Sequence, residues 1–579
     1  MASTDIARVM GPAVGRERQR ADAAARAGTS RLDRLVPAGW LLPIVVALAM
    51  ALFAESAYLL AERRADGQGI FAGQLWASHD VAQYVAAMND GARGAWLIRD
   101  RLTAEEHVPA FIYGFYVLLG KVVHALGIDA DAGYRLAGVI GRVFMLLAVY
   151  RTTSLVSPTA WRRQVAFGLT VLGGGLISLL TLLQVVTGLD LGLLGSDLNE
   201  PEFGTFILLF ASPHLMVGLG LLLLAAHAYA RAWRSRHAWD AVAAASLTVA
   251  LGVVNSYSLA TLCAVVSIHA LVMTALARRL VWRGLIAAGL VNLAALPILA
   301  YGVLTFVLGA DPFWGVAYGK QNVTPTPTLA NVAAAFGLVL VLAVAGVRSF
   351  GRRATSGRVL VLVWIAAMAL MMYLPVGVQR RFAFGLQPML ALVAAFALPP
   401  LWRFISAPRP RPWTLARPIL ILLLFQALVG SSAVLAAVAV SQALDAGTPG
   451  PGLVRQDFYP ASLRPAARWL AEQSGPEDVV LAQPKTGNYL VREIAGRVYV
   501  GHWSATVDYE QKRREVAWFF AGPLDPERQA FLAARGIRYV VLGPIERMTA
   551  SPAWTGFEQA GLVPIYDVDG VVIFAVGPA

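Results

Sequence analysis

The chain has 579 residues, of which 57% are hydrophobic and 14% charged, and its formal net charge is +13. Its mean hydropathy is +0.60, and apolar runs of about 18 residues or more recur along it, the length that crosses a bilayer core. The arginines gather in short clusters between these runs, as in cytoplasmic loops, so the positive charge does not indicate a nucleic-acid partner. The single cysteine, Cys263, excludes a disulfide within the chain and a Cys-based metal site. We therefore expect a polytopic α-helical membrane protein.

The N-terminal part sets the expected orientation. Residues 1–34 are rich in arginine and alanine and are predicted to form a basic cytoplasmic tail. The first span follows at residues 35–60, which places the next loop, with Asp80, on the outer face. The apolar stretch at residues 109–126 then decides the orientation of everything after it. Its marginal length and polar interior favour a juxtamembrane helix lying in the interface, and the alternative, a full crossing, would invert every later loop.

With that helix at the interface, the remaining apolar runs alternate across the membrane and bring the total to about eleven spans. An acidic loop at residues 190–202, which contains no Lys or Arg, then faces outward. The membrane domain is predicted to comprise residues 35–441, followed by a linker at residues 442–452 with Pro449 and Pro451.

Residues 453–579 have the composition of a soluble domain on the outer face. Short apolar runs at residues 478–482, 497–500 and 539–542 predict buried strands. Amphipathic segments at residues 463–473 and 508–520 predict helices, and residues 563–576, interrupted by Asp569-Gly570, predict a β-hairpin. We expect a small α/β domain.

The first outer loop carries the residues on which chemistry is expected. Asp80, flanked by His79 and followed one turn later by Tyr84, stands beside the membrane. A carboxylate there can keep a raised pKa and accept a proton from a hydroxyl group, as a general base does, although a solvated loop acid is an equal alternative. Glu105, Glu106 and His107 open the interfacial helix, where the helix dipole alone would also favour acids.

A second acidic group on the outer face contains Asp197, Glu200 and Glu202. Asp80 with Asp197 and Glu200 would offer oxygen ligands for Mg²⁺ or Mn²⁺ beside a phosphate. Short acidic outer loops also follow from topology alone. His214 lies inside the next apolar run, where an imidazole is either a packing group or a functional one.

Arg380 and Arg381 fall on the outer face at a span end, where the charge rule disfavours them. A lipid phosphate would compensate, because guanidinium groups match phosphate oxygens, and the alternative is snorkelling to lipid headgroups. Lys320 is a weaker candidate of the same kind. In the soluble domain, Asn488 and residues 501–503 follow predicted strands, where loops could lean over the membrane cavity, although most such residues are structural.

Several of these features together resemble the GT-C superfamily of membrane glycosyltransferases. They are the N-terminal span, the outer loop with an acid near its start, the sequence Glu-Glu-His-Val-Pro at residues 105–109 before an apolar helix, and Arg135 at the head of the next span. The superfamily includes protein O-mannosyltransferases, oligosaccharyltransferase catalytic subunits and aminoarabinose transferases. The resemblance covers residues 35–440 in architecture and residues 76–150 in motifs.

The resemblance implies a hexosyltransferase-type enzyme of the inner or plasma membrane. It implies inverting transfer of a sugar from a polyprenyl-phosphate or polyprenyl-diphosphate donor to a glycan, lipid or protein acceptor on the outer face. Asp80 matches the catalytic acid of the first loop, Asp197 or Glu200 the second-loop acids, and Arg380 or Arg381 the arginine that binds donor phosphate. The lone Asp80 beside His79 departs from the paired acids of oligosaccharyltransferases, and His107-Val108-Pro109 departs from His-Pro-Pro. These departures leave the metal and the donor class open.

Two other functions compete with a transferase. A transporter or flippase of lipid-linked saccharides should place polar groups near mid-bilayer and across both leaflets, whereas here they gather on one face. A scaffold would use the soluble domain to recruit envelope partners. A cavity that joins Asp80, the second acidic loop and Arg380 would favour the transferase.

Overall fold

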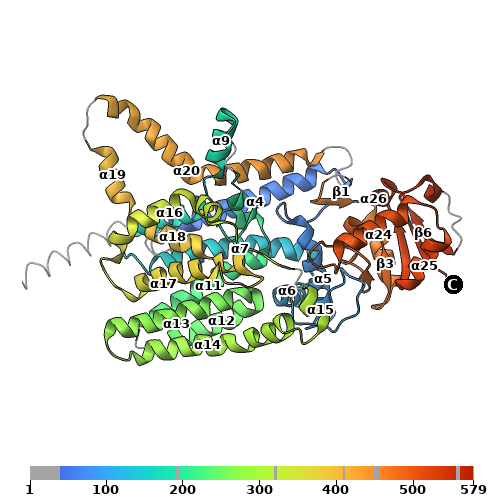
Figure 1. The fold of residues 1–579 in the computed structure, drawn as a ribbon, viewed down its shortest axis with the longest axis horizontal. Coiled ribbons are helices and arrows are strands. Elements are labelled where there is room, and N and C mark those ends of the chain that lie inside the picture. Colours follow the sequence, from blue (N-terminus) through green and yellow to red (C-terminus); the bar gives the residue numbers. More distant parts are fainter. Residues whose placement is uncertain are drawn as a thin grey trace, which may run out of the picture.

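The computed structural model describes residues 39–577 apart from 190, 191, 194, 236, 318–321, 408–410, 448–452, 454 and 556–560. The predicted basic tail, Lys320 and the second half of the predicted linker lie outside the described residues. A bundle of long helices makes up most of the molecule, and a small sheet domain sits at one end of it (Figure 1). The expected fold, a polytopic helical membrane protein with a small C-terminal α/β domain, is confirmed.

Most of the expected spans are long apolar helices, as lipid requires, because it offers the backbone no hydrogen-bond partner. Among the described residues, seven helices are long and apolar enough to cross a membrane. They are α4 (Leu41–Arg64), α7 (Ala130–Thr153), α11 (Pro213–Ala232), α13 (Tyr257–Ala277), α14 (Trp282–Gly302), α16 (Leu329–Gly351) and α20 (Arg411–Leu444).

Two further spans are bent pairs of helices. α8 (Ala160–Leu172) meets α9 (Ile177–Thr187) at 53°, and α18 (Leu386–Ala394) meets α19 (Leu398–Ser406) at 47°. Counting each pair as one span gives nine within the described part of the chain. α12 (Trp239–Val254) and α17 (Ser356–Met371) occupy two more expected spans but are shorter. The expected number of about eleven spans is therefore not confirmed by length and composition.

The stretch at residues 109–126 forms a short helix. α6 (Gly114–Ala125) has 12 residues, so it is about 18 Å long, well short of a bilayer core of about 30 Å. It packs closely against α5 (Val81–Ala92). Gly91 of α5 and Gly120 of α6 allow this approach, because a Cβ on either would collide with the backbone of the other helix. The length agrees with an interfacial helix and not with a crossing one.

The C-terminal domain is built on a five-stranded sheet in the order β4-β3-β5-β7-β6. β3 (Val479–Leu481) pairs in parallel with β4 (Arg497–Val498) and β5 (Ile537–Leu542), and β7 (Val571–Val576) is antiparallel to β5 and to β6 (Leu562–Val568). These strands and the hairpin lie where the sequence predicts them.

Helices cover both faces of this sheet. Val480 faces a core that includes α22 (Leu463–Gln473), and its neighbours Val479 and Leu481 face a second core that includes α24 (Tyr509–Ala521). Both helices were expected. The sequence analysis did not anticipate the short helices α23 (Pro484–Leu490), α25 (Pro526–Ala534) and α26 (Pro544–Arg547).

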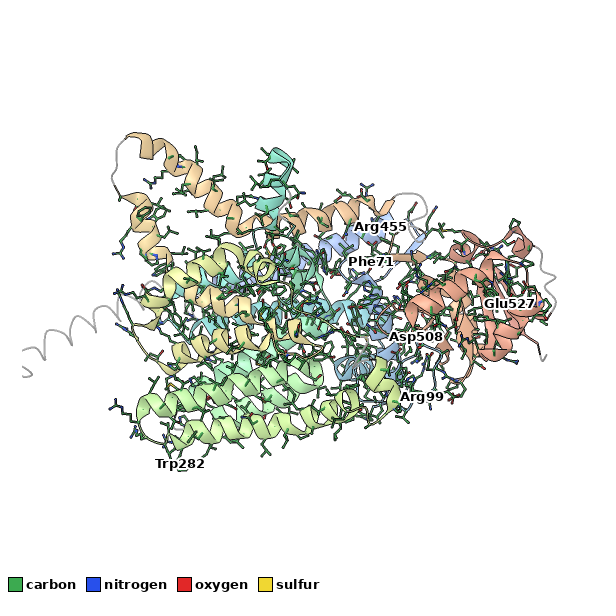
Figure 2. All side chains as sticks on the ribbon, viewed as in Figure 1. Phe71, Arg99, Trp282, Arg455, Asp508 and Glu527 are labelled. Carbon is green, nitrogen blue, oxygen red and sulfur yellow. The ribbon has the colours of Figure 1, made fainter. Side chains whose placement is uncertain are left out.

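The first outer loop is joined to the C-terminal domain by main-chain pairing. β1 (Gly69–Phe71) pairs with β2 (Phe458–Pro460), and Thr103 forms a β-bridge with Val500. Phe71 and Arg455 both contact the ring of Phe458 at this junction, and Trp282 lies at the opposite end of the helix bundle (Figure 2). The loop and the domain therefore form one unit, although more than 300 residues separate them in sequence.

Candidate functional site

A carboxylate and two imidazoles come together where the loop and the domain meet. Asp80 is the last residue of the short 3-10 helix η1 (Ser78–Asp80), directly before α5. Nε2 of His502 lies 2.9 Å from Oδ1 of Asp80, and Nε2 of His79 lies 3.6 Å from the same oxygen. The two imidazole rings stack with their centroids 4.9 Å apart. We call Asp80, His79 and His502 the Asp80 group.

Neighbouring residues of the C-terminal domain fix the two imidazoles. Trp503 donates its indole N–H to Nε2 of His79 at 3.2 Å, and Asn488 of α23 donates to the carbonyl oxygen of His79 at 2.9 Å. On His502, Nδ1 lies 3.0 Å from Oγ of Ser504. His502 and Trp503 therefore contact the first outer loop, although a structural role was the favoured interpretation of residues at this strand end.

The Asp80 carboxylate is ionised at neutral pH. Burial alone would raise its pKa, but the imidazoles of His502 and His79, which lie against it, hold the pKa below its ordinary value. Burial lowers the pKa of His79, so that imidazole is neutral. The raised pKa predicted for Asp80 from its place beside the membrane is wrong, because the sequence did not show the imidazole that packs against it.

An aromatic layer lies behind Asp80. Tyr84 of α5 stacks on Tyr116 of α6 with centroids 4.3 Å apart. The hydroxyl of Tyr116 lies 2.8 Å from Nδ1 of His214, at the start of α11. The charges of Asp80 and Arg381 both act on His214. Tyr84, His214 and Arg381, three of the sequence candidates, thus lie on the same side of the molecule as Asp80.

Arg381 belongs to the 3-10 turn η5 (Gln379–Ala383) before α18. Its guanidinium lies 4.4 Å from the ring centroid of Tyr257, and one of its nitrogens is 3.5 Å from Oδ1 of Asn322. Within the described part of the chain, no carboxylate forms an ion pair with it. The charge of Asp80 nevertheless acts on it.

The neighbouring arginine is engaged differently. Arg380 lies 2.8 Å from Oε1 of Glu200 and 3.4 Å from Oε2 of Glu202. We call these three residues the Arg380 group. Two carboxylates on one guanidinium already compensate its charge, so Arg380 does not need a lipid phosphate for that purpose.

The three acids expected to hold Mg²⁺ or Mn²⁺ are not brought together among the described residues. Asp197, in α10 (Ser196–Asn199), is buried, and its Oδ2 lies against Gly175 at the bend between α8 and α9. Glu200 is paired with Arg380. Since Mg²⁺ favours several converging oxygen ligands, Asp80, Asp197 and Glu200 do not fit such an ion. Over the described ranges, the metal-ligating side chains that do converge are the three of the Asp80 group.

The prediction that Glu105, Glu106 and His107 open the interfacial helix is wrong, because α6 begins only at Gly114 and these residues lie in the loop before it. Each is engaged by another element: Glu105 by Lys512 at 2.6 Å, Glu106 by Arg497 at 3.9 Å, and His107 by the ring of Phe313 in α15 (Pro312–Trp314), with centroids 3.7 Å apart. In the described structure none of the three contacts Asp80. They attach the loop to the C-terminal domain and to α15.

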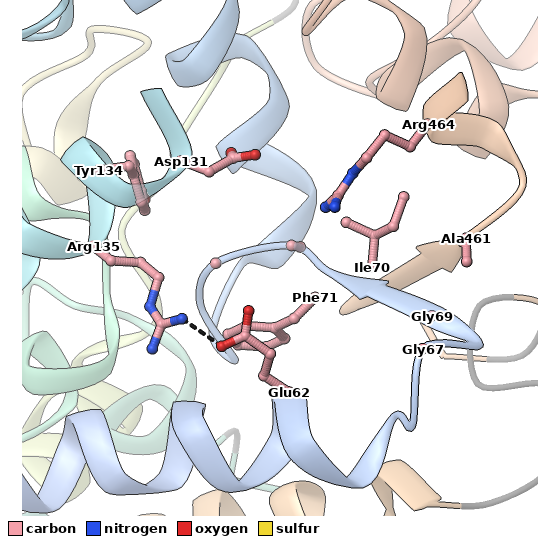
Figure 3. A pocket seen from close by; sticks show the side chains of 12 residues that line it. Glu62, Gly67, Gly69, Ile70, Phe71, Asp131, Tyr134, Arg135, Ala461 and Arg464 are labelled. Atoms are coloured by element: carbon pink, nitrogen blue, oxygen red, sulfur yellow. Dashed lines mark hydrogen bonds and ion pairs between the residues drawn. The ribbon is translucent and has the colours of Figure 1, made fainter. Parts of the chain in front are cut away.

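A cavity of about 300 Å³ opens nearby, at the seam between α4, β1, α7 and the C-terminal domain (Figure 3). Arg135 lines it and is held by Glu55 at 2.5 Å and Glu62 at 2.6 Å. Arg464 reaches in from the domain side. The lining residues include none of the Asp80 group or the Arg380 group, so this is not the joining cavity that the sequence analysis anticipated.

No protein-family model and no curated protein matches the chain. Solved structures resemble it at low identity. The oligosaccharyltransferase of Archaeoglobus fulgidus is 15% identical, with a TM-score of 0.49 and coverage of 93% of this chain and 74% of that one. ArnT of Cupriavidus metallidurans, solved with undecaprenyl phosphate, is 15% identical, with a TM-score of 0.46 and coverage of 94% and 100%.

The mycobacterial arabinofuranosyltransferase AftD is 17% identical, with a TM-score of 0.46 and coverage of 92% of this chain and 41% of that one. At these identities the likeness concerns the course of the chain, and function has to come from the residues of the site.

Proposed function

We propose that the protein is a membrane glycosyltransferase that moves a hexose-type sugar from a polyprenyl-phosphate donor to a hydroxyl acceptor. The observation that supports this most directly is the Asp80 carboxylate. It is ionised, three-quarters buried, and placed between the apolar bundle and the C-terminal domain, with a guanidinium close enough for their charges to interact. Such a site suits a reaction between a lipid-borne donor and a polar acceptor.

Asp80 acts as the general base in this proposal. It takes the proton of the acceptor hydroxyl while that oxygen bonds to the anomeric carbon and the bond from this carbon to the phosphate oxygen breaks. A single displacement of this kind inverts the anomeric centre. His502, whose Nε2 lies 2.9 Å from Oδ1, holds the carboxylate in place. About a quarter of the Asp80 side chain is exposed, which leaves room for an acceptor.

Arg381 is the better candidate for the donor phosphate. The departing phosphate gains negative charge, and a guanidinium stabilises it through charge-assisted hydrogen bonds. Arg380 already faces Glu200 and Glu202, whereas Arg381 meets only a ring and an amide over the described ranges. His214 and Tyr84 lie close enough to both Asp80 and Arg381 for their electrostatic interactions to be felt.

The acceptor side is proposed to be the outer face of the plasma or inner membrane, with the N-terminus in the cytoplasm. Trp282, whose sequence neighbours include Arg278, Arg279 and Arg283, lies at the end of the bundle farthest from the C-terminal domain (Figure 2). Basic residues favour the cytoplasmic side. This supports an extracytoplasmic C-terminal domain.

A transporter or flippase of lipid-linked saccharides is the second candidate. The bend of 53° between α8 and α9, with the buried carboxyl of Asp197 at the start of α9, resembles the broken helices that transporters use. A transporter would move the lipid-linked saccharide across the membrane without cleaving the bond between sugar and phosphate.

Purified protein incubated with polyprenyl-phosphate sugars distinguishes the two. A transferase should consume the donor and release free polyprenyl phosphate in detergent, where transport has no meaning. The Asp80→Asn variant should still bind the donor but should no longer consume it. Donor that stays intact with every acceptor, combined with sugar-lipid movement across liposomes, would replace the transferase proposal by the transporter.

A further inference from the structure

We propose that His79, Asp80 and His502 bind a divalent metal ion of the Zn²⁺ type, which links the first outer loop to the C-terminal domain. This inference does not depend on the transferase proposal, because it concerns binding and is tested without a sugar donor. The three ligand atoms lie within 4.8 Å of one another.

The distances match the geometry of a tetrahedral site. Zn²⁺ binds imidazole nitrogens and carboxylate oxygens at about 2.0–2.1 Å, which puts neighbouring ligand atoms about 3.3 Å apart. The two separations measured to Oδ1 of Asp80, 2.9 Å for His502 and 3.6 Å for His79, lie on either side of that value. Only the distance between the two imidazoles has to shorten. The His79 side chain is about one-third exposed, so it can rotate to do so.

One nitrogen of the group has no hydrogen-bond partner. Nε2 of His502 is buried and makes no hydrogen bond within the described structure, although Oδ1 of Asp80 is only 2.9 Å away. The carboxylate oxygen therefore lies off the line along which this nitrogen directs a proton or a lone pair. A buried polar atom without a partner costs about 1–3 kcal/mol. An ion bound between His502 and Asp80 would remove that cost.

The surroundings provide the supporting contacts that a metal-binding histidine needs. Such a residue keeps the proton on its other nitrogen and gives it to an oxygen. In the structure Nδ1 of His502 accepts the N–H of Ser504 at 3.2 Å. Binding of the ion through Nε2 therefore moves the imidazole proton to Nδ1, where Oγ of Ser504, 3.0 Å away, can accept it. On His79, the indole N–H of Trp503 occupies Nε2 at 3.2 Å and would have to turn away. The Trp503 side chain is more than half exposed, so water can replace this bond.

The ligand types select the class of metal. Two imidazoles and one carboxylate suit Zn²⁺ and its close analogue Co²⁺, whereas Mg²⁺ and Ca²⁺ prefer oxygen ligands. Three protein ligands leave a fourth position for water or an oxygen of a bound molecule, as in sites that are not purely structural. Both measured approaches are to Oδ1 of Asp80, so Oδ2 stays available for proton transfer when the ion is bound.

The test is Co²⁺ binding to the full-length protein, purified without a polyhistidine tag and stripped with a chelator. We expect one equivalent of Co²⁺ with the visible absorption of a tetrahedral ion, displaced by Zn²⁺ and not by excess Mg²⁺. His502→Ala should weaken binding by more than about 100-fold, the upper range for losing only an outer-shell partner. His124→Gln is the matched control, because His124 is an exposed histidine of the neighbouring helix α6, and should bind as the wild type does.

A second variant guards against misfolding of His502→Ala. Trp503→Phe removes the donor that competes for Nε2 of His79 and keeps every ligand, so it should bind Co²⁺ at least as tightly as the wild type. Unchanged Co²⁺ binding in His502→Ala, displacement by Mg²⁺, or weaker binding in Trp503→Phe would each overturn the metal site. None of these results depends on transfer activity, so a negative result here leaves the transferase test standing on its own.

Discussion

The two polar groups of this membrane protein differ in how their charges are balanced. In the Arg380 group, two carboxylates face one guanidinium at 2.8 Å and 3.4 Å, and all three residues belong to the membrane domain. In the Asp80 group, one carboxylate faces two imidazoles, and one of these comes from a domain more than 400 residues further along the chain. In the first group both carboxylates are held by a guanidinium, whereas in the second the carboxylate faces only imidazoles.

This difference separates residues that hold the fold from residues that can do chemistry. Paired charges in a low-dielectric setting stabilise each other and leave little to offer a substrate. A carboxylate whose pKa is held down by imidazoles stays ionised and can still accept a proton from a bound hydroxyl. We therefore expect substitutions in the Asp80 group to affect activity and those in the Arg380 group to affect stability.

The largest expected effect compares two acids. Asp80→Asn should lower the rate of donor consumption by about 10²- to 10⁴-fold, the usual contribution of a general base. Glu200→Gln should lower it by less than about 10-fold, because Glu202 still faces Arg380. Initial rates with a polyprenyl-phosphate sugar measure both. Equal losses in the two variants would remove the distinction between the groups.

The next comparison uses two adjacent arginines. Arg381→Ala should raise the KM for the donor by about 10- to 100-fold, the worth of one hydrogen bond to a charged group. Arg380→Ala should leave KM near that of the wild type and lower the melting temperature, because Glu200 and Glu202 would lose their partner. A KM that responds only to Arg380→Ala would transfer the phosphate role to that residue.

The membrane architecture could be predicted from sequence because it depends on local composition. Apolar runs, turn residues and alternation predicted the first span at residues 35–60, where α4 (Leu41–Arg64) lies, and the strands of the C-terminal sheet. The short α6 also agrees with the interfacial helix, since Gly114 and Lys121 made a crossing unfavourable. Each of these features can be read from a window of about 20 residues.

The pairing of the polar residues could not be predicted in that way. Asp80 was expected beside Asp197 and Glu200, yet it meets His502, and Glu200 meets Arg380. Charge pairing between distant segments depends on how the helices pack, and one sequence contains no information about it beyond residue type. The signal that was available was His502 itself, a histidine at a strand end in a domain expected to face the same loop.

A smaller effect should come from the contact that brings His502 to Asp80. Glu105 pairs with Lys512 at 2.6 Å, and the Lys512 side chain is only 6% exposed. Glu105→Gln would leave a buried ammonium without its counter-charge and should destabilise the docked C-terminal domain by about 1–3 kcal/mol.

The neighbouring acid is the matched control for that contact. Glu106 is 86% exposed and lies 3.9 Å from Arg497, so Glu106→Gln should change stability by less than about 1 kcal/mol, as for surface ion pairs. Limited proteolysis and thermal unfolding in detergent report docking in both variants. Similar losses in Glu105→Gln and Glu106→Gln would mean that the loop is not held by the buried pair.

The smallest expected effect is a dependence of docking on pH that comes from Asp100, an acid whose charge acts on His502 of the Asp80 group. Burial raises the pKa of Asp100 to about 7. The N–H of Leu102 donates a hydrogen bond to Oδ1 at 2.9 Å, which lowers this pKa but by less than burial raises it. The folded protein therefore keeps a proton that the unfolded chain releases near pH 4, and stability falls as pH rises from about 4 to 7 and then levels off. Asp100→Asn keeps the acceptor for Leu102 and removes the titration, so its melting temperature should change less between pH 5 and 8. At pH 8 the unfolding free energy of Asp100→Asn should exceed that of the wild type by about 1 kcal/mol. The gain is smaller than the full pKa shift implies, because the new amide N–H₂ would take the place of Oδ2. In the described structure Oδ2 is buried without a hydrogen-bond partner, so the amide would have none either. The charge of Asp100 acts on His502, so a wild-type melting temperature that does not vary over this range would mean that this acid is already ionised beside the Asp80 group.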